Sequence, residues 1–424
     1  MYFTYIVYAL FIMLFIWGGK FAGIYRTQFN EDSSSLEVTK SLRGIAALGV
    51  ILHHVSQETA FQKIGAVHGF VNIGYLFVAV FFFWSGFGLV KSLESKSDYL
   101  NGFMKRRVVK VLVIPFYVNV LIFALFHLVL GTQMPLAQWI TNFLGITLMN
   151  DYAWYPIVAG ILYTAFYLLF KNLNNRRGCF GICVAVIGLF ILLQGLFFCI
   201  SGHFAWWAGE KNWWLSGSGW AKAKWWMGFK VFWFSGEWWV NSSPAFVVGL
   251  LFAHFESQIR AWFKSFYWLK VLLIFVLTVA LTVLSMFAQE HFGYWTEFNG
   301  KGPGIINKLF TYIMQVPQSL ILVVLLFAVM LKYYASNPVT SFLGKISLET
   351  YMMNLMAVTC FRFLLYDRTS DGQMNPFYKA GNYNLALYLI AVIASSIVLA
   401  LIYRRLNIFV QKLVFEHKDS IKRI

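Results

Sequence analysis

Residues 271–289 read VLLIFVLTVALTVLSMFAQ, a stretch without a charged side chain. A helix of about 20 mostly apolar residues crosses the hydrocarbon core of a bilayer, so this stretch predicts a transmembrane helix. Comparable uncharged runs are 2–19, 44–57, 64–90, 111–150, 152–170, 178–209, 238–255, 309–331 and 380–403. One further run, 345–365, is interrupted by Glu349 and Arg362. We therefore expect about eleven spans, with residues 136–149 lying in the membrane interface.

The composition agrees with a membrane protein. Hydrophobic residues make up 59% of the chain and charged residues 12%, with a mean hydropathy of +0.66. A soluble domain usually carries about a quarter charged residues, so this chain lacks the surface that a soluble protein needs. The predicted fold class is all-α, a polytopic transmembrane helical bundle. No linker or repeat divides it, so residues 1–424 are expected to form a single membrane domain.

The net charge of +17 comes from 34 Lys+Arg against 17 Asp+Glu. In a soluble chain this excess would suggest nucleic acid, but basic residues also collect on the cytoplasmic side of membrane spans. With the N-terminus outside, the expected cytosolic segments 20–43, 91–110, 171–177, 256–270, 332–345 and 404–424 hold 24 of them, and 34 − 24 = 10 remain elsewhere. We predict an outside N-terminus, a cytosolic C-terminus and the lipid bilayer, not nucleic acid, as partner. The first span lacks a basic n-region and an A-x-A site, so we expect a retained anchor.

The tryptophans and the cysteines of the chain each raise a separate question about its fold and function. Ten of the 17 tryptophans lie in the expected outward loop 201–240. This loop is either an aromatic belt at the membrane interface or a platform on which sugar rings stack. The four cysteines, Cys179, Cys183, Cys199 and Cys360, match no metal or disulfide spacing and are interpreted as small core residues. We expect no metal site and no bound cofactor.

The second span, SLRGIAALGVILHH (41–54), is the main candidate for chemistry. Arg43 and His54 are eleven residues apart, so a helix places them within about 20° of one face and about 16 Å apart. His53 points about 80° away and is the weaker candidate. Ionisable residues inside a span are functional candidates by default. An imidazole can be a neutral base at neutral pH, although His54 could equally be a hydrogen-bonded packing residue.

Four motifs resemble one known family. The Arg43–x10–His54 spacing is similar to the signature helix of the membrane acyltransferase-3 family of bacterial envelope-modifying enzymes. VFFFWSGF (80–87), KRRVVK (105–110) followed by IPF (114–116), and LGKISLETY (343–351) resemble further motifs of that family, in the same order. The resemblance covers residues 38–405, with an extra span, 1–20, in front. The chain departs from the pattern at Lys110, where arginine is common, and at Asn354, where a histidine is frequent.

The resemblance implies a multi-pass O-acyltransferase of the bacterial inner membrane. It implies a cytosolic acyl-CoA as co-substrate, which we expect to be acetyl-CoA. The acceptor would be a hydroxyl of a cell-envelope carbohydrate or lipid-linked saccharide. Its catalytic residues would be His54, as base or transient acyl carrier, and Arg43, along whose face the pantetheine arm would run.

The remaining candidates also follow from the resemblance. Arg107 and Lys110, on one face of an α-helix at the cytosolic edge, and neighbouring Arg106 would bind the acyl-CoA phosphates. Ordinary positive-inside anchoring explains these three residues equally well. Ser347 and Tyr351 would orient the thioester or acceptor, or act as interhelical hydrogen-bond partners. Glu349 and His53 are further supporting candidates.

A transporter or flippase of a saccharide or lipid-linked substrate is the main rival, because many spans and intramembrane charges suit it too. Transporters often show two related halves with broken helices, and no such duplication is visible. A degenerate family member that serves as an assembly partner is a third possibility. Binding of acyl-CoA separates the enzyme from both.

Overall fold

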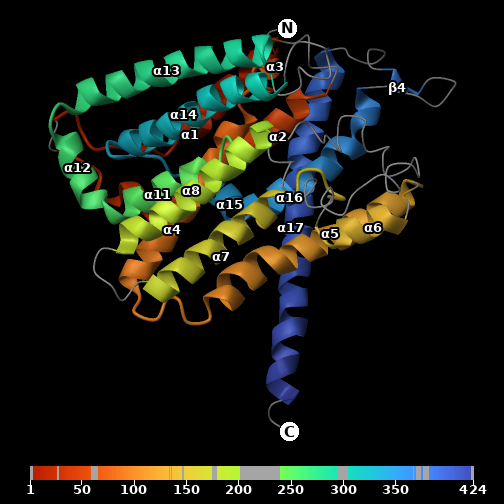
Figure 1. The fold of residues 1–424 in the computed structure, drawn as a ribbon. Helices are drawn as coiled ribbons and strands as arrows, with labels where there is room; N and C mark the ends of the chain where they lie inside the picture. Colours follow the sequence, from red (N-terminus) through yellow and green to blue (C-terminus); the bar gives the residue numbers. More distant parts are fainter. Residues whose placement is uncertain are drawn as a thin grey trace. The chain divides into compact units, whose positions relative to one another are not determined.

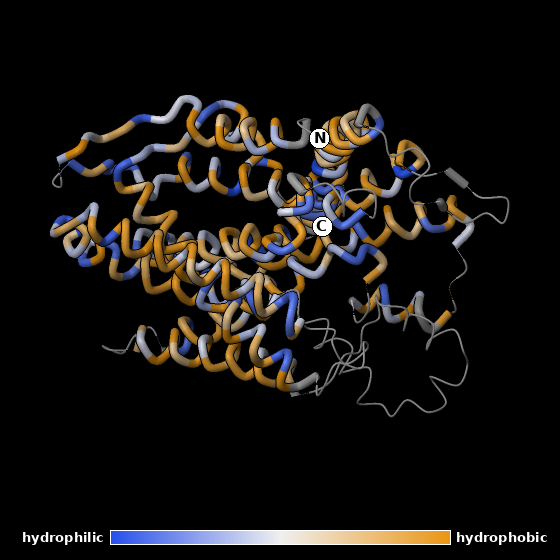
Figure 2. Tube along the Cα trace, turned by 90° about the horizontal axis from the view of Figure 1, so that it is seen from above, coloured by the Kyte–Doolittle hydropathy of each residue, from blue (hydrophilic) through white to orange (hydrophobic). Residues whose placement is uncertain are grey.

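The computed structural model describes residues 3–25, 28–58, 65–132, 134, 136–145, 148–173, 179–200, 239–293, 304–365, 367–368, 374–375 and 382–421. Helices form almost all of the regular structure in these ranges (Figure 1), so the all-α fold class is confirmed. The predicted tryptophan-rich loop 201–240 falls outside the described residues up to residue 238. Much of the described helical trace is hydrophobic (Figure 2), as expected for a chain embedded in lipid.

The helices of the first half are α1 (Phe3–Ile16), η1 (Glu31–Ser34), α2 (Leu36–Ser56), α3 (Gly65–His68), α4 (Gly74–Ser95), η3 (Met104–Val113), α5 (Ile114–Val129), α6 (Leu136–Phe143), α7 (Tyr155–Leu173) and α8 (Cys179–Ile200). Those of the second half are α11 (Pro244–His254), α12 (Glu256–Lys264), α13 (Tyr267–His291), α14 (Gly304–Met330), α15 (Pro338–Lys345), α16 (Ser347–Cys360), η7 (Arg362–Leu364) and α17 (Asn382–Ile421). Two short antiparallel pairs of strands complete the described elements: β1 (Lys20–Phe21) with β2 (Tyr333–Tyr334), and β3 (Asp367–Arg368) with β4 (Met374–Asn375).

Six of the described helices are long and apolar enough to cross a membrane by length and composition. They are Gly74–Ser95, Met104–Val129, Cys179–Leu196, Tyr267–His291, Ile306–Met330 and Asn384–Phe415. The chain is therefore a multi-pass membrane protein. The count of eleven spans and the orientation of the two ends stay predictions. The expected run 345–365 is divided between α16, with 14 residues, and the short 3₁₀ helix η7.

The described contacts divide the chain into two compact units. Unit 1 comprises Met1–Trp84, Phe255–Val279 and Ile321–Arg404, and unit 2 comprises Ser85–His254, Ala280–Leu320 and Arg405–Ile424. These are units of packing, and a single membrane domain can contain both, so the single-domain prediction is not affected. Each unit is described separately below.

In unit 1, α2 packs against α15 and α16, and the close approach to α15 depends on two glycines. A Cβ on Gly344 would lie 2.0 Å from the carbonyl oxygen of Lys40, and one on Gly44 would lie 2.2 Å from that of Thr340. Because those oxygens belong to the backbone, neither glycine can take a side chain without separating the helices. Small residues are what membrane helices use for such close crossings.

The N-terminal helix α1 also packs into unit 1. Val7 of α1 is buried in an apolar cluster with Ile51 of α2 and Val358 of α16, and Tyr8 stacks on Phe70 with ring centroids 5.1 Å apart. Asn337, which caps α15 through the Thr340 amide, donates to carbonyls of the α1 end at residues 14 and 17. Helix α1 therefore packs on the helices that carry the candidate site.

In unit 2, residues 104–113 form a π-helix, in which each amide bonds the carbonyl five residues earlier. It packs against α5 and α7, while α8 packs against α7 and α11. Cys179, Cys183 and Cys199 are buried as predicted, and Cys360, which belongs to unit 1, is exposed. The interpretation of the cysteines as core residues is wrong for Cys360 because its side chain lies on the outer face at the end of α16.

Candidate active site on helices α2 and α16

The helix that carries Arg43 and His54 is continuous from Leu36 to Ser56. Ser35 begins it as an N-cap, its side chain accepting from the Val38 amide. The structure therefore places Arg43 and His54 on one uninterrupted helix, as their spacing predicts. Arg43 is half-buried, and its Nε donates to the Thr39 carbonyl one turn earlier, 3.2 Å away.

His54 is buried, with 7% of its surface exposed, and its Nδ1 lies 2.7 Å from Oδ1 of Asn354 on α16. Asn354 is fully buried, and its Nδ2 donates to the carbonyls of Tyr351, at 2.8 Å, and Thr350, at 3.4 Å. These two bonds turn the amide oxygen towards His54. We therefore assign the proton of the neutral imidazole to Nδ1, which donates to Asn354 and leaves the basic lone pair on Nε2.

His53 has a different environment. Its Nδ1 donates to the Phe70 carbonyl at 3.0 Å, and its Nε2 accepts from Nε2 of Gln57 at 3.3 Å. Gly74 makes room for the ring, since a Cβ there would lie 2.3 Å from it. Both ring nitrogens thus form hydrogen bonds with residues that follow α2, so His53 has a packing role. Its expected support of catalysis stays a prediction.

The three candidates on α16 are close in sequence but make different contacts. The hydroxyl of Ser347 donates to the Gly344 carbonyl at 3.1 Å, so it stabilises the start of its own helix. Tyr351 is buried one turn further on. Glu349 is within electrostatic range of Arg404 of α17, whose Nη1 donates to the Lys345 carbonyl at 3.1 Å. Arg404 is therefore the basic residue near Glu349, and the roles of Ser347, Glu349 and Tyr351 stay predictions.

One ion pair near His54 was not recognised from the sequence. Glu58 lies four residues after His54, and its Oε1 accepts from Nε and Nη2 of Arg362 at 2.9 and 2.8 Å. The Glu58 side chain is 8% exposed and that of Arg362 is 39% exposed. Arg362 is eight residues beyond Asn354, so the two chain segments joined by the His54–Asn354 contact are joined again beyond it.

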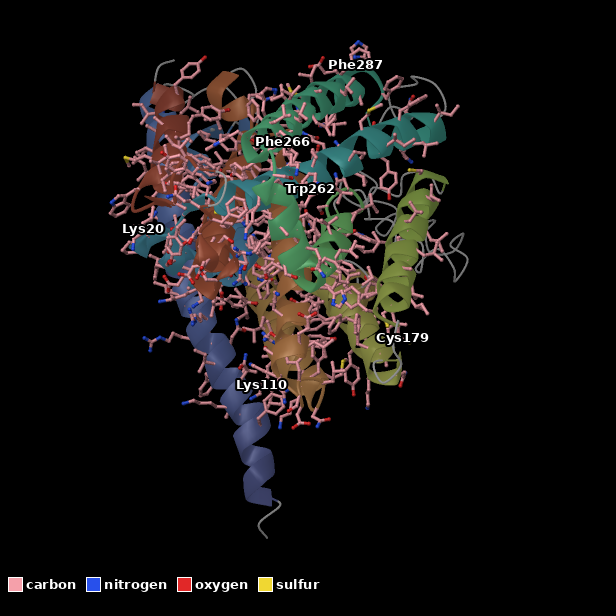
Figure 3. The ribbon with its side chains drawn as sticks, turned by 90° about the vertical axis from the view of Figure 1, so that its left-hand side faces the viewer. Lys20, Lys110, Cys179, Trp262, Phe266 and Phe287 are labelled. Atoms are coloured by element: carbon pink, nitrogen blue, oxygen red, sulfur yellow. The ribbon has the colours of Figure 1, made fainter. Side chains whose placement is uncertain are left out.

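The basic candidates belong to unit 2. Arg106 and Arg107 are exposed and gather at Tyr99: Nη2 of Arg106 donates to its carbonyl at 2.9 Å, and the guanidinium of Arg107 lies 5.8 Å from its ring centroid. Lys110 instead lies 4.7 Å from the ring centroid of Phe415, as does Lys105. Figure 3 shows Lys110 beside the tail of α17.

The expected α-helical face shared by Arg107 and Lys110 is not formed. The π-helix brings residues five apart above one another, which is why Lys105 and Lys110 share a ring. The structure therefore groups the cations as two arginines at Tyr99 and two lysines at Phe415. Whether they bind acyl-CoA stays a prediction.

A multi-pass helical protein with a buried histidine–amide pair on facing helices is the class that these observations define. The family model described as an acyltransferase domain matches residues 40–405, and the chain belongs to this acyltransferase-3 family. The resemblance seen in the sequence is thereby confirmed, and the chain is a membrane acyltransferase. No curated protein and no solved structure matches it.

Proposed function

We propose that this protein is an O-acyltransferase of the bacterial inner membrane that transfers an acetyl group from cytosolic acetyl-CoA to a hydroxyl of a cell-envelope carbohydrate or lipid-linked saccharide. The observation that carries the proposal is the buried His54–Asn354 contact, which leaves a lone pair on Nε2, in a chain of the acyltransferase-3 family. A hydroxyl needs a base of this kind to become a nucleophile near neutral pH.

The proposed reaction has two proton transfers at one nitrogen. Nε2 of His54 takes the proton of the acceptor hydroxyl as its oxygen forms a bond to the thioester carbonyl carbon. The C–S bond then breaks, and the thiolate of CoA takes the same proton from the imidazolium. Throughout, Nδ1–H donates to Asn354, which holds the ring in one orientation. In the alternative order, His54 first takes the acyl group from CoA as a transient acyl-imidazole and then passes it to the acceptor hydroxyl.

The donor would be held by cations. Arg43, about three turns before His54 on the same helix, would contact the incoming acyl-CoA. Arg106, Arg107 and Lys110 would pair with its phosphates, arginine by a two-pronged contact and lysine as a point charge. The exposure of the two arginines on η3 suits a soluble, polyanionic co-substrate.

The deciding experiment follows acetyl release from labelled acetyl-CoA by purified full-length protein in lipid, with and without saccharide acceptors. We expect His54→Ala to abolish transfer while retaining the fold and the binding of CoA. Gln57→Ala, one turn away and exposed, is the control and should turn over normally. Full turnover by folded His54→Ala protein would refute the proposal.

A further inference from the structure

The Glu58–Arg362 pair has features that a purely structural ion pair does not need. The Glu58 carboxylate is buried, and removing a carboxylate from water has a desolvation cost that pairing with an arginine only partly offsets. The neighbouring Val55, Val358 and Leu365 belong to an apolar cluster. An apolar pair would join the two segments at this place with no such cost, so stability alone does not account for the charges.

The pair is also close to the proposed base. Glu58 is four residues beyond His54 and two beyond Ser56, the last residue of α2. His54, near the end of α2, contacts Asn354 of α16, and Glu58, just after α2, pairs with Arg362 of η7, just after α16. The two contacts follow one another along the same two chain segments, so an acceptor bound at Nε2 of His54 can extend towards the ion pair.

The chemistry of the pair fits a hydroxyl group. Arg362 donates two of its N–H groups to a single oxygen of Glu58, so the guanidinium is held in a fixed orientation, and 39% of its side chain stays exposed. A guanidinium only donates and a carboxylate only accepts. A single hydroxyl group, which can accept from Arg362 and donate to Glu58, matches both.

We infer that Glu58 and Arg362 form the acceptor subsite, which binds the hydroxyl adjacent to the one that is acylated. The inference rests on the proposed acyltransferase function and specifies its acceptor as a compound with vicinal hydroxyls. Neither Glu58 nor Arg362 forms or breaks a covalent bond in the reaction. They bind and orient the acceptor, and they determine which hydroxyls are used.

The test uses two ring alcohols that differ in one hydroxyl, 1,2-cyclohexanediol and cyclohexanol, with methyl glucoside as the saccharide. Acetyl transfer from labelled acetyl-CoA is measured for each with the full-length protein in lipid. The wild type should prefer the diol by about 10- to 100-fold in kcat/KM, which corresponds to one charged hydrogen bond. Glu58→Gln and Arg362→Lys should each lose most of this preference and raise the KM for methyl glucoside, with the KM for acetyl-CoA unchanged.

Two controls separate binding from folding. Arg260→Lys alters a similar part-buried pair of unit 1, in which Nε of Arg260 lies 3.1 Å from Oε1 of Glu256. It should change the melting temperature without changing the diol preference. The exchange Glu58→Arg with Arg362→Glu rebuilds an ion pair with donor and acceptor reversed, so it should recover melting temperature but not the wild-type KM for methyl glucoside.

The outcomes are distinct. Equal use of diol and cyclohexanol by the wild type would overturn the acceptor subsite and leave the acyltransferase intact. Recovery of both melting temperature and acceptor KM in the exchanged variant would show that the pair is only structural. If acetyl-CoA supports no transfer to any alcohol and His54→Ala changes nothing, the proposed function fails and the subsite falls with it.

Discussion

At the scale of single residues, the contact between His54 and Asn354 determines what the imidazole can do. Asn354 stands where the resemblance to the family leads one to expect a histidine, so this position of α16 carries no titrating group. In the structure its amide oxygen faces Nδ1 of His54 at 2.7 Å, because its Nδ2 is bound by two carbonyls of α16. An amide does not titrate near neutral pH, so this arrangement fixes the tautomer without adding a second ionisable group.

Replacing Asn354 tests this assignment. Asn354→Leu removes the acceptor for Nδ1–H, and we expect turnover to fall by about 10- to 100-fold, the usual effect of losing a residue that orients a reacting histidine. Asn354→Asp supplies a carboxylate acceptor and should retain more activity than the leucine variant. Initial rates with labelled acetyl-CoA measure both.

The control for that prediction is another buried amide pair. Nδ2 of Asn150 donates to Oδ1 of Asn119 at 3.1 Å in unit 2. Asn119→Leu should lower the melting temperature as Asn354→Leu does, with turnover near that of the wild type. Equal loss of turnover in both variants would mean that Asn354 acts through stability alone.

The sequence predicted some of these residues and not others, for a simple reason. Arg43 and His54 lie on one helix, and helical periodicity is enough to place them on one face. Asn354 is 300 residues from His54, and Arg362 is 304 residues from Glu58. Contacts over such distances depend on how helices pack, which a single sequence does not specify.

At the scale of elements, the crossing of α2 and α15 depends on the absence of side chains at Gly44 and Gly344. Gly344→Ala would place a methyl 2.0 Å from the Lys40 carbonyl oxygen. That oxygen belongs to the backbone of α2, so relieving the clash requires the two helices to separate. We expect the variant to be less stable by about 1–3 kcal/mol, as for an overpacked interior. Thermal unfolding in detergent or lipid measures the change.

A second glycine provides the comparison. Gly88 of α4 has nothing within 4 Å of its virtual Cβ, so Gly88→Ala should be neutral or slightly stabilising. A Gly344→Ala protein as stable as Gly88→Ala would contradict the close crossing. The sequence does not identify α15 as the helix that packs against Gly44, because α15 is short, with only 8 residues, and carries no long apolar run.

The π-helix changes what is expected of the basic motif. Sequence periodicity assumes 3.6 residues per turn, so it paired Arg107 with Lys110, whereas the structure pairs Arg107 with Arg106 at Tyr99. If these arginines bind the phosphates of acetyl-CoA, Arg107→Ala should raise its KM by about tenfold, the effect of one charged hydrogen bond. Lys105→Ala removes an equal charge from the same helix and should change the KM less. Equal effects would indicate only a generally positive surface.

At the scale of the whole molecule, composition alone predicted a helical membrane protein, because the lack of charge leaves no soluble surface. The number of crossings is harder to predict, since it depends on helices such as α2, whose Arg43 and histidines lower its apolarity without showing whether it spans. The division into two packing units also depends on contacts between distant segments, so it has no local signal in the sequence.

The orientation of the chain can be tested directly, and the proposed donor site depends on it. The 24 basic residues in the expected cytosolic segments, against 10 elsewhere, predict a cytosolic C-terminus. A green fluorescent protein fused after the last residue should therefore fluoresce, and alkaline phosphatase fused at the same place should be inactive. The paired fusion after Asp151, in an expected outward loop, should give the opposite result. Active phosphatase at the C-terminus would show that the chain has the opposite orientation in the membrane. Arg43 would then face away from the compartment that holds acetyl-CoA.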